Sequence, residues 1–429
     1  MSAPVYLDHA ATTPLRPEVR DAWLETQQLV GNASSIHGAG QQARRVLEDA
    51  RERLAAVLGC EPIEVVLTSG GTESIGLALQ GLWRSRATSA ERIVLPDGEH
   101  HATLDTVGWL ASHEGSSVTP VSLDAAGRIP VEAFMAALAE HTGPDVESTM
   151  RASATTRRDA AKDAAPASPR GSGQMRSGSA RAAVATALVA GNETGTVNDA
   201  AGLSRAAADA GVPLHLDAVA AFGHVGVEFS GWRGDASPGT GLVALSVSGH
   251  KIGAPVGTGA LVVSRTATVE PLLHGGGQQR GLRAGTQDIA GAVALARAAE
   301  LAELEREAEA MRLGELRERF LSALRRDIPE AVVLGDPEHR LPGTIHLHLP
   351  GAGGESLLFL LDQRGISVST GSACQAGVAE PSHVVMALGY SQTEASQVLR
   401  ISLGRTTTAE DVDALAGALP VSYRRLAAR

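Results

Sequence analysis

The sequence predicts an α/β fold in which a large domain is followed by a smaller α+β domain. Short apolar runs alternate with helical periodicity over the first two thirds of the chain, which is typical of α/β architecture. Beyond about residue 268 a long helical pattern precedes an alternating strand. A mass of 44.1 kDa also exceeds what one hydrophobic core usually serves. We therefore assign residues 15–267 to the large domain, and residues 1–14 and 268–429 to the small one.

Individual elements follow from hydrophobic periodicity. In the large domain the helical pattern is clearest at residues 43–58 and 72–83. Five short runs there have strand character: residues 93–95, 187–190, 214–216, 242–247 and 260–263. In the small domain we expect a helix over residues 289–312 and a strand over residues 344–349, where apolar and polar side chains alternate.

Composition limits the class of protein. The net charge of −11 argues against a dedicated nucleic-acid binder, which usually carries a basic surplus. The first residues lack a basic segment followed by an apolar core, and no apolar run approaches membrane-spanning length. Two cysteines, Cys60 and Cys374, are too few for a disulfide framework or a cysteine-rich metal site. We expect a cytoplasmic enzyme with no membrane partner and no direct nucleic-acid partner.

Residues 151–181 differ in composition from the rest of the chain. They contain no Val, Ile, Leu, Phe, Trp or Tyr, and seven basic side chains outnumber two acidic ones. Such a segment cannot bury enough apolar area to offset the entropy lost on ordering. We interpret it as a disordered, solvated insertion in the large domain. The alternative is a basic arm for tRNA or an acidic partner.

Lysine is almost absent, which draws attention to the two that remain. Lys162 lies in the insertion, and Lys251 follows the apolar run at residues 242–247. Arginine stays protonated at any working pH, whereas a lysine amine can lose its proton and act as a nucleophile or base. A reactive lysine at the end of a buried strand indicates Schiff-base chemistry, most often with pyridoxal phosphate. The alternative is a surface lysine retained by chance.

Two further positions suit such a cofactor. Gly71 and Thr72 follow a strand end and open a helix, where free backbone amides and the helix dipole favour a phosphate. Asp217 ends a probable buried strand and could keep a pyridine nitrogen protonated. Each has a simpler interpretation: a plain helix start for the first, and a turn residue or helix cap for the second.

Three other side chains are candidates for chemistry. His100 follows a strand, and its imidazole could stack on a pyridine ring while handling protons; a metal site is disfavoured because no ligand cluster accompanies His100 and His101. Cys374 lies in a loop of small residues, where an exposed thiol is placed for reaction, whereas Cys60 suits an apolar core. Arg400 interrupts an apolar strand, so its guanidinium needs either a substrate carboxylate or a structural ion pair.

Together these residues resemble the cysteine desulfurases, pyridoxal-phosphate enzymes in the class V aminotransferase branch. The resemblance covers nearly the whole chain and includes the long-loop Ser-x-Gly-Ser-Ala-Cys motif that ends at Cys374. The other matching segments are residues 6–14, 31–37, 192–195, 274–286 and 379–383.

The resemblance implies fold type I, with a mixed, mostly parallel sheet flanked by helices in the large domain. It implies pyridoxal 5'-phosphate as cofactor, held by Gly71, Thr72, His100, Asn192, Asp217, Ser248, His250 and Lys251. It also implies that Thr286 reaches the neighbouring subunit's phosphate in a homodimer. Substrate contacts would come from Asn32, Asn192 and Arg400.

The implied reaction converts L-cysteine to L-alanine. Lys251 would remove the Cα proton, His100 would assist, and Cys374 would retain the sulfur as a persulfide. The sulfur acceptor would be an iron–sulfur scaffold protein or a tRNA-thiolation enzyme.

Several positions depart from the family pattern. Ala220 stands where a glutamine usually contacts the cofactor's phenolic oxygen, Gly76 replaces an asparagine, Ala33 replaces a proline, and Gln375 replaces a small hydroxyl residue. Ala220 favours one alternative, a catalytically weak paralogue that binds the cofactor. A second alternative is a selenocysteine lyase-like enzyme, which the cysteine loop disfavours only in part.

Overall fold

The computed structural model describes residues 4–86, 91–140, 182–371, 374–375 and 378–427. The expected α/β fold is confirmed, and the insertion at residues 151–181 lies outside the described residues. The largest sheet of the described chain has the strand order β2-β8-β7-β6-β5-β3-β4. Its strands are β2 (Val65–Thr68), β3 (Arg92–Pro96), β4 (Ser117–Val121), β5 (Ala182–Leu188), β6 (Pro213–Asp217), β7 (Gly241–Ser248) and β8 (Gly259–Val263).

The sheet is mixed and mostly parallel. β8 runs antiparallel to both of its neighbours, β7 and β2, and the other adjacent pairs are parallel. The carboxyl ends of β2, β5, β6 and β7 therefore meet at one edge. Open α/β sheets place their ligands at this edge, because the loops that follow the strands converge there.

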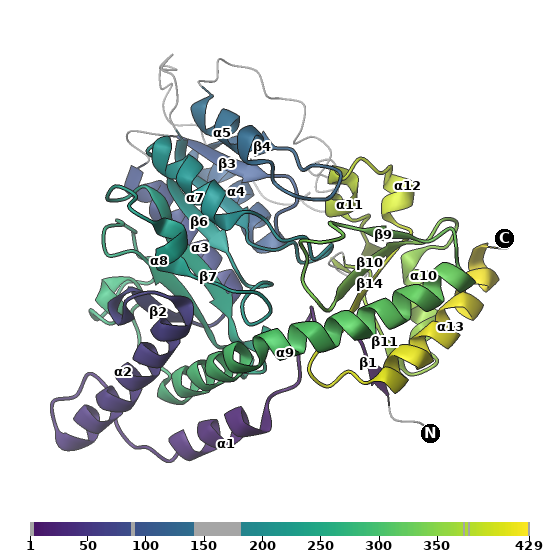
Figure 1. Cartoon of the computed structure of the whole chain (residues 1–429). Helices are drawn as coiled ribbons and strands as arrows, with labels where there is room; N and C mark the ends of the chain where they lie inside the picture. Colours follow the sequence, from purple (N-terminus) through teal and green to yellow (C-terminus); the bar gives the residue numbers. More distant parts are fainter. Residues whose placement is uncertain (1–3, 87–90, 141–181, 372–373, 376–377, 428–429) are drawn as a thin grey trace, which may run out of the picture.

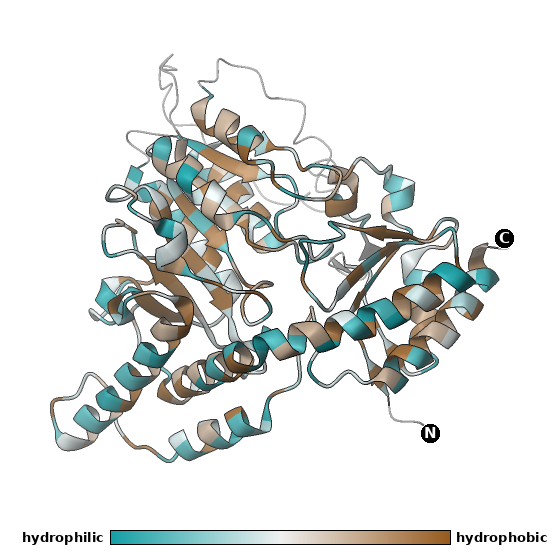
Figure 2. Ribbon diagram, in the orientation of Figure 1, coloured by the Kyte–Doolittle hydropathy of each residue, from teal (hydrophilic) through white to brown (hydrophobic). Residues whose placement is uncertain are grey.

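Helices cover both faces of the sheet (Figure 1). One face packs on α3 and α4, and the other on α2, α5, α7, α8 and the first half of α9. Buried apolar side chains fill both layers. In Figure 2 the strands of this sheet are accordingly mostly brown, the colour of hydrophobic residues. The helices are α1 (Pro17–Thr26), α2 (Gly38–Leu58), α3 (Gly71–Arg86), α4 (His101–Glu114), α5 (Val131–Ala139), α7 (Ala200–Asp209), α8 (Phe229–Arg233) and α9 (Ile289–Asp327).

A second, smaller core lies around an antiparallel sheet of order β14-β10-β9. The second half of α9 and the helices α10 and α13 pack on it, and α9 lies beside α13 (Figure 1). The elements here are β1 (Val5–Tyr6), β9 (Val332–Leu334), β10 (Thr344–His348), α10 (Gly354–Asp362), β11 (Ile366–Ser367), β12 (Cys374–Gln375), β13 (Val378–Ala379), α11 (His383–Ala387), α12 (Gln392–Ala395), β14 (Val398–Ser402) and α13 (Ala409–Ala427). β1 pairs with β11, so the N-terminus joins this unit.

Two elements differ most from the expectation. β5 covers Ala182–Leu188 rather than residues 187–190, because its first half is buried but rich in alanine, a residue that gives little strand signal, and only Val184 there is β-branched. α9 continues to Asp327 instead of ending near residue 312. It takes part in two cores along its length: Leu295 packs in the large core and Leu324 in the small one. The domain boundary at residues 267 and 268 stays a prediction.

None of the helices in the described part of the chain is both long and apolar enough to cross a membrane.

Candidate active site

A cavity of about 400 Å³ lies at the carboxyl edge of the large sheet, facing the smaller unit. It brings together most of the residues that the sequence singled out. Those that line it are Gly71, Thr72, His100, Asn192, Asp217, Ser248, His250, Lys251 and Arg400. The large sheet and its loops supply all of them except Arg400, which lies on β14. The site thus forms where the two units meet.

Lys251 ends the short 3-10 turn η3 (Gly249–Lys251), which follows β7 directly. Its amine donates hydrogen bonds to the backbone carbonyls of Ala10 and Ala11, the latter at 3.1 Å. Burial, and then the charge of Arg400, lower the pKa of Lys251 to about 8. A substantial fraction of the amine is therefore neutral near physiological pH, as a nucleophile or base requires.

An anion cradle lies at the start of α3, between β2 and Gly71. Gly70 has φ +148°, a conformation that favours glycine, and a Cβ there would lie 3.7 Å from the Ser248 hydroxyl oxygen. That hydroxyl is buried and has no hydrogen-bond partner among the described residues. A buried orphan donor beside the amides of a helix N-terminus suits a phosphate group.

Asp217 ends β6 and is 2% exposed. Its Oδ1 accepts a 2.9 Å hydrogen bond from the Val219 amide. Burial raises the pKa of Asp217 to about 6, opposed by that hydrogen bond and the charge of Lys251. A protonated pyridine nitrogen would supply the counter-charge that this buried carboxylate needs.

His100 caps the N-terminus of α4, where its Nδ1 accepts a 3.1 Å hydrogen bond from the Ala102 amide. Burial, and then the charge of Lys251, lower the pKa of His100 to about 4. The imidazole is therefore neutral at physiological pH. It can lie against an aromatic ring and donate or accept a proton through Nε2.

Arg400 is 6% exposed in the middle of β14. Its Nη2 donates to Asp8 Oδ1 at 3.0 Å, and its Nη1 donates to the Asn192 carbonyl at 3.0 Å. The buried Nε has no partner among the described residues. The structure thus supplies the ion pair that the buried guanidinium required, and leaves one donor available for a ligand.

The two cysteines lie in different parts of the fold. Cys374 begins β12, which pairs with β13 in a two-stranded hairpin. Gly371 before this hairpin and His383 after it both line the cavity, so the loop leaves and returns at the site. Cys60 is half-buried against the large core, and burial raises the pKa of its thiol to about 12. Its thiol stays protonated and poorly nucleophilic.

Two expected site residues lie elsewhere. Asn32 and Thr286 are exposed and do not line the cavity. Asn32 accepts a 2.9 Å hydrogen bond from the Ser34 amide in a local turn. Their assigned roles in binding substrate and the neighbouring phosphate stay predictions.

Sequence reasoning missed several residues of the site. The backbone carbonyls of Ala10 and Ala11 accept hydrogen bonds from the Lys251 amine. A pattern of side chains cannot predict such backbone acceptors. Glu99 is fully buried beside His100; burial, and then the charge of Asp217, raise its pKa to about 8. His383, whose Nε2 lies 2.9 Å from the Glu99 carbonyl oxygen, also lines the cavity. Its place in the matched segment 379–383 was the available signal.

The donor set fits pyridoxal phosphate. The cavity contains an amine of lowered pKa, a buried carboxylate for a ring nitrogen, and an orphan hydroxyl beside a helix N-terminus for a phosphate. Lys251, Asp217 and Ser248 with Gly71 would hold the three ends of the cofactor.

The chain is similar to known proteins over nearly its whole length. The family model for class V aminotransferases matches residues 5–145 and 176–415. The chain is 41% identical over 424 residues to the IscS-like cysteine desulfurase of Mycobacterium tuberculosis, covering 98% of this chain and 96% of that protein. It is 38% identical over 419 residues to a cysteine desulfurase of Cereibacter sphaeroides, covering 97% and 95%. Among solved structures, a NifS-like protein superposes with a TM-score of 0.80 at 28% identity, covering 97% of this chain and 98% of that one.

Proposed function

The chain belongs to the class V aminotransferase family, and within it to the pyridoxal-phosphate-dependent cysteine desulfurases; from this premise we propose how its own residues divide the work. The substrate is L-cysteine and the products are L-alanine and a persulfide on Cys374. The observation that carries the proposal is the convergence of Lys251, Asp217 and the anion cradle on one cavity.

Pyridoxal phosphate, when bound, supplies an electron sink for the charge that develops at the substrate Cα. Lys251 would hold the cofactor and then move the Cα proton, a role that suits an amine with a pKa of about 8. Asp217 would keep the ring nitrogen protonated, and His100, as a neutral imidazole, would stack on the ring. The remaining cofactor contacts would come from other residues that line the cavity: Asn192, Ser248, His250, Gly71 and Thr72.

Arg400 orients the substrate. Its buried Nε has no hydrogen-bond partner among the described residues, and two other hydrogen bonds fix the guanidinium in place. A substrate carboxylate could accept a hydrogen bond from this Nε. Asn192, whose carbonyl is one of those acceptors, has its own buried Oδ1 without a partner among the described residues. These two side chains are therefore the substrate contacts within one subunit.

Cys374 accepts the sulfur. The thiolate sulfur bonds to the substrate sulfur while the substrate carbon–sulfur bond breaks, so that Enz–SH and L-cysteine become Enz–S–SH and L-alanine. No net oxidation is needed, because the carbon gains the hydrogen that the sulfur loses. A hairpin that leaves and returns at the cavity suits a thiol that must collect sulfur and then present it outside.

The working unit is a homodimer in which Thr286 completes the partner's phosphate site. The segments at residues 31–37 and 274–286 border a common groove of about 560 Å³. Apolar side chains at or beside them are exposed, including Val30, Ile36 and Leu273. Exposed apolar side chains around a groove are typical of a surface that another chain covers. The second subunit would bring Asn32 and Thr286 to the sites.

The persulfide is then passed to an iron–sulfur scaffold protein or to a tRNA-thiolation enzyme. Both acceptors work with free thiols, which persist in a reducing compartment, so we place the enzyme in the cytoplasm.

The test is an assay of the purified protein loaded with pyridoxal phosphate. We expect equal amounts of alanine and sulfide from L-cysteine in the presence of a thiol reductant. Visible cofactor absorbance without alanine release would contradict the proposal and favour a catalytically weak paralogue.

A further inference from the structure

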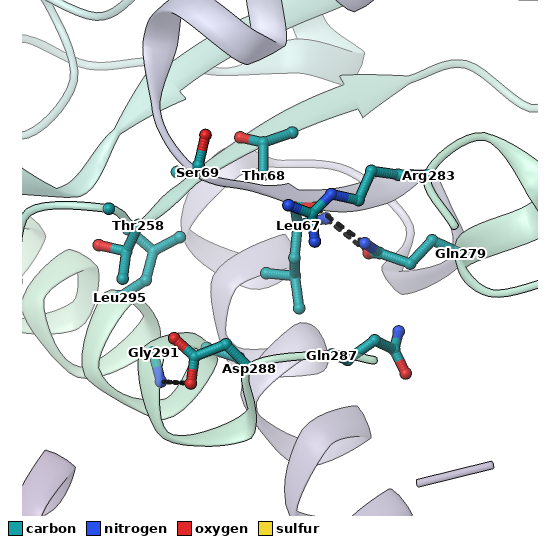
Figure 3. Close-up of a pocket in the computed structure, with 13 residues that line it drawn as sticks. Leu67, Thr68, Ser69, Thr258, Gln279, Arg283, Gln287, Asp288, Gly291 and Leu295 are labelled. Atoms are coloured by element: carbon teal, nitrogen blue, oxygen red, sulfur yellow. Dashed lines mark hydrogen bonds between the residues drawn. The ribbon is translucent and has the colours of Figure 1, made fainter. Parts of the chain in front are cut away.

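The segment that carries Thr286 is fastened to the edge of the large sheet by a side-chain amide. Gln279 is buried, its Oε1 accepts a 2.6 Å hydrogen bond from the Leu67 amide, and its Nε2 donates a 2.8 Å hydrogen bond to the Leu67 carbonyl (Figure 3). β2 is an edge strand, paired only with β8 within the sheet. The side-chain amide of Gln279 therefore forms the same pair of hydrogen bonds with Leu67 that the backbone of a neighbouring antiparallel strand would form.

The backbone at this point adopts a conformation that these residues disfavour. Gln279 has φ +50° and Arg280 has φ +61° in the short turn η4 (Gln279–Gly281). Two consecutive non-glycine residues in the left-handed region cost free energy, and they persist only where the surroundings hold them. Hydrogen bonds on both residues hold this conformation. Gln279 bonds to Leu67, and Arg280 Nη1 donates to the carbonyls of Val263 and Ile63, at 2.9 and 3.2 Å.

A second attachment follows four residues later. Arg283 Nε donates to Glu73 Oε1 at 2.9 Å, and Glu73 Oε2 accepts from the Ser69 amide at 2.6 Å. Glu73 lies in the first turn of α3, beside the anion cradle. The segment is thus bonded to β2 through Gln279 and to the first turn of α3 through Arg283. Thr286, three residues after Arg283, remains exposed.

We propose that Gln279 is a positioning residue that fixes the Thr286 segment for use by the partner subunit's phosphate site. The inference rests on the proposed homodimer. The strained turn sets the direction in which the Thr286 segment runs on from the edge of β2. The two hydrogen bonds between Gln279 and Leu67 hold the turn in place. Gln279 itself does not line the cavity of the candidate site; its effect passes through the next seven residues to Thr286.

The experiment compares Gln279→Ala with Gln397→Ala in the full-length dimer. Gln397 is a matched control because its amide oxygen also accepts a backbone hydrogen bond, from Gly351 at 3.0 Å, in the smaller unit. For Gln279→Ala we expect the dissociation constant for pyridoxal phosphate to rise about tenfold or more, the loss expected for two hydrogen bonds. The control should bind like the unmodified enzyme. Hydrogen exchange at β2 should rise only in the Gln279 variant.

Mixed dimers test the direction of the effect. In the first, a subunit with both Lys251→Ala and Gln279→Ala is paired with an unmodified one, so the only lysine-bearing site receives an altered segment. In the second, Lys251→Ala is in one subunit and Gln279→Ala in the other, so that site receives an intact segment. We expect weak covalent capture of the cofactor in the first mixed dimer and normal capture in the second.

The reverse pattern, or equal and normal capture in both, would overturn the inference while leaving the enzyme assignment intact. Failure of the assignment itself has a separate sign, namely covalent cofactor capture by the Lys251→Ala homodimer. Should Gln279→Ala not fold, Gln279→Glu retains an acceptor for the Leu67 amide but loses the donor. We expect it to weaken cofactor binding in the same mixed-dimer pattern, and unchanged affinity there would contradict the role.

Discussion

Arg400 Nη2 donates a 3.0 Å hydrogen bond to Asp8 Oδ1, joining residues that lie 392 positions apart in the sequence. Asp8 precedes the two alanines whose carbonyls hold the Lys251 amine, and Arg400 lowers the pKa of that amine while Asp8 raises it. The ion pair therefore connects the proposed substrate-binding arginine with the protonation of the lysine. Two segments from opposite ends of the chain thus act on one amine.

Arg400→Lys should raise the KM for L-cysteine about tenfold or more, because an ammonium cannot reproduce the guanidinium fork and hydrogen bonds to charged groups contribute about 1.5–3 kcal/mol. kcat should fall less than kcat/KM. Steady-state kinetics with L-cysteine measure both constants. An unchanged KM would mean that Arg400 serves only the ion pair with Asp8.

Capture of pyridoxal phosphate by the cofactor-free enzyme should speed up as the pH rises and level off above about 8, because only the neutral Lys251 amine attacks. Asp8→Asn should move this profile to lower pH, since the charge of Asp8 raises the pKa of the amine. Stopped-flow absorbance at several pH values measures the rates. A profile that does not move, or moves upward, would contradict the electrostatic account.

Lys251→Ala should abolish covalent attachment of the cofactor and the release of alanine. The only other lysine in the sequence is Lys162, within the insertion at residues 151–181. Absorbance spectra before and after borohydride reduction, followed by mass spectrometry, identify the modified residue. Lys162→Ala serves as the control and should retain the unmodified spectrum and rate.

Cys374→Ser should bind the cofactor normally but form no persulfide, because an alcohol does not accept the sulfur. Cys60→Ser is the matched control and should retain the persulfide, since burial raises the pKa of the Cys60 thiol to about 12 and keeps it protonated. Alkylation of the sulfur-loaded enzyme followed by peptide mapping locates the sulfur. Finding it on Cys60 would reverse the assignment.

Ala220→Gln should tighten cofactor binding, because it adds a donor at a position that lines the cavity beside Lys251 and that the family usually fills with glutamine. A hydrogen bond to a charged oxygen contributes about 1.5–3 kcal/mol. Fluorescence titration with pyridoxal phosphate measures the affinity, and alanine release measures the rate. If both fall, the cavity has closed around alanine, and overpacking of about 1–3 kcal/mol outweighs the new bond.

The local chemistry of this enzyme could be predicted from the sequence alone. Strand and helix periodicity located β6 and the start of α3, and so placed Asp217 and Gly71 at element ends. The scarcity of lysine singled out Lys251, and the small-residue loop singled out Cys374. These signals are readable because each depends on neighbours within a few turns or on one residue's intrinsic chemistry.

Only the tertiary structure decided which groups act on each other. The carbonyls that hold Lys251, the partner of Arg400 and the exchange between Gln279 and Leu67 all join residues more than 200 positions apart. α9 likewise serves two cores whose other members come from both ends of the chain. Periodicity reports the face that a segment buries, but the partner on that face is set by the topology of the whole sheet. For that reason the sequence singled out candidate reactive side chains, and the fold decided the pKa values of Lys251 and Asp217, the hydrogen bonds that hold them and the exposure of Thr286.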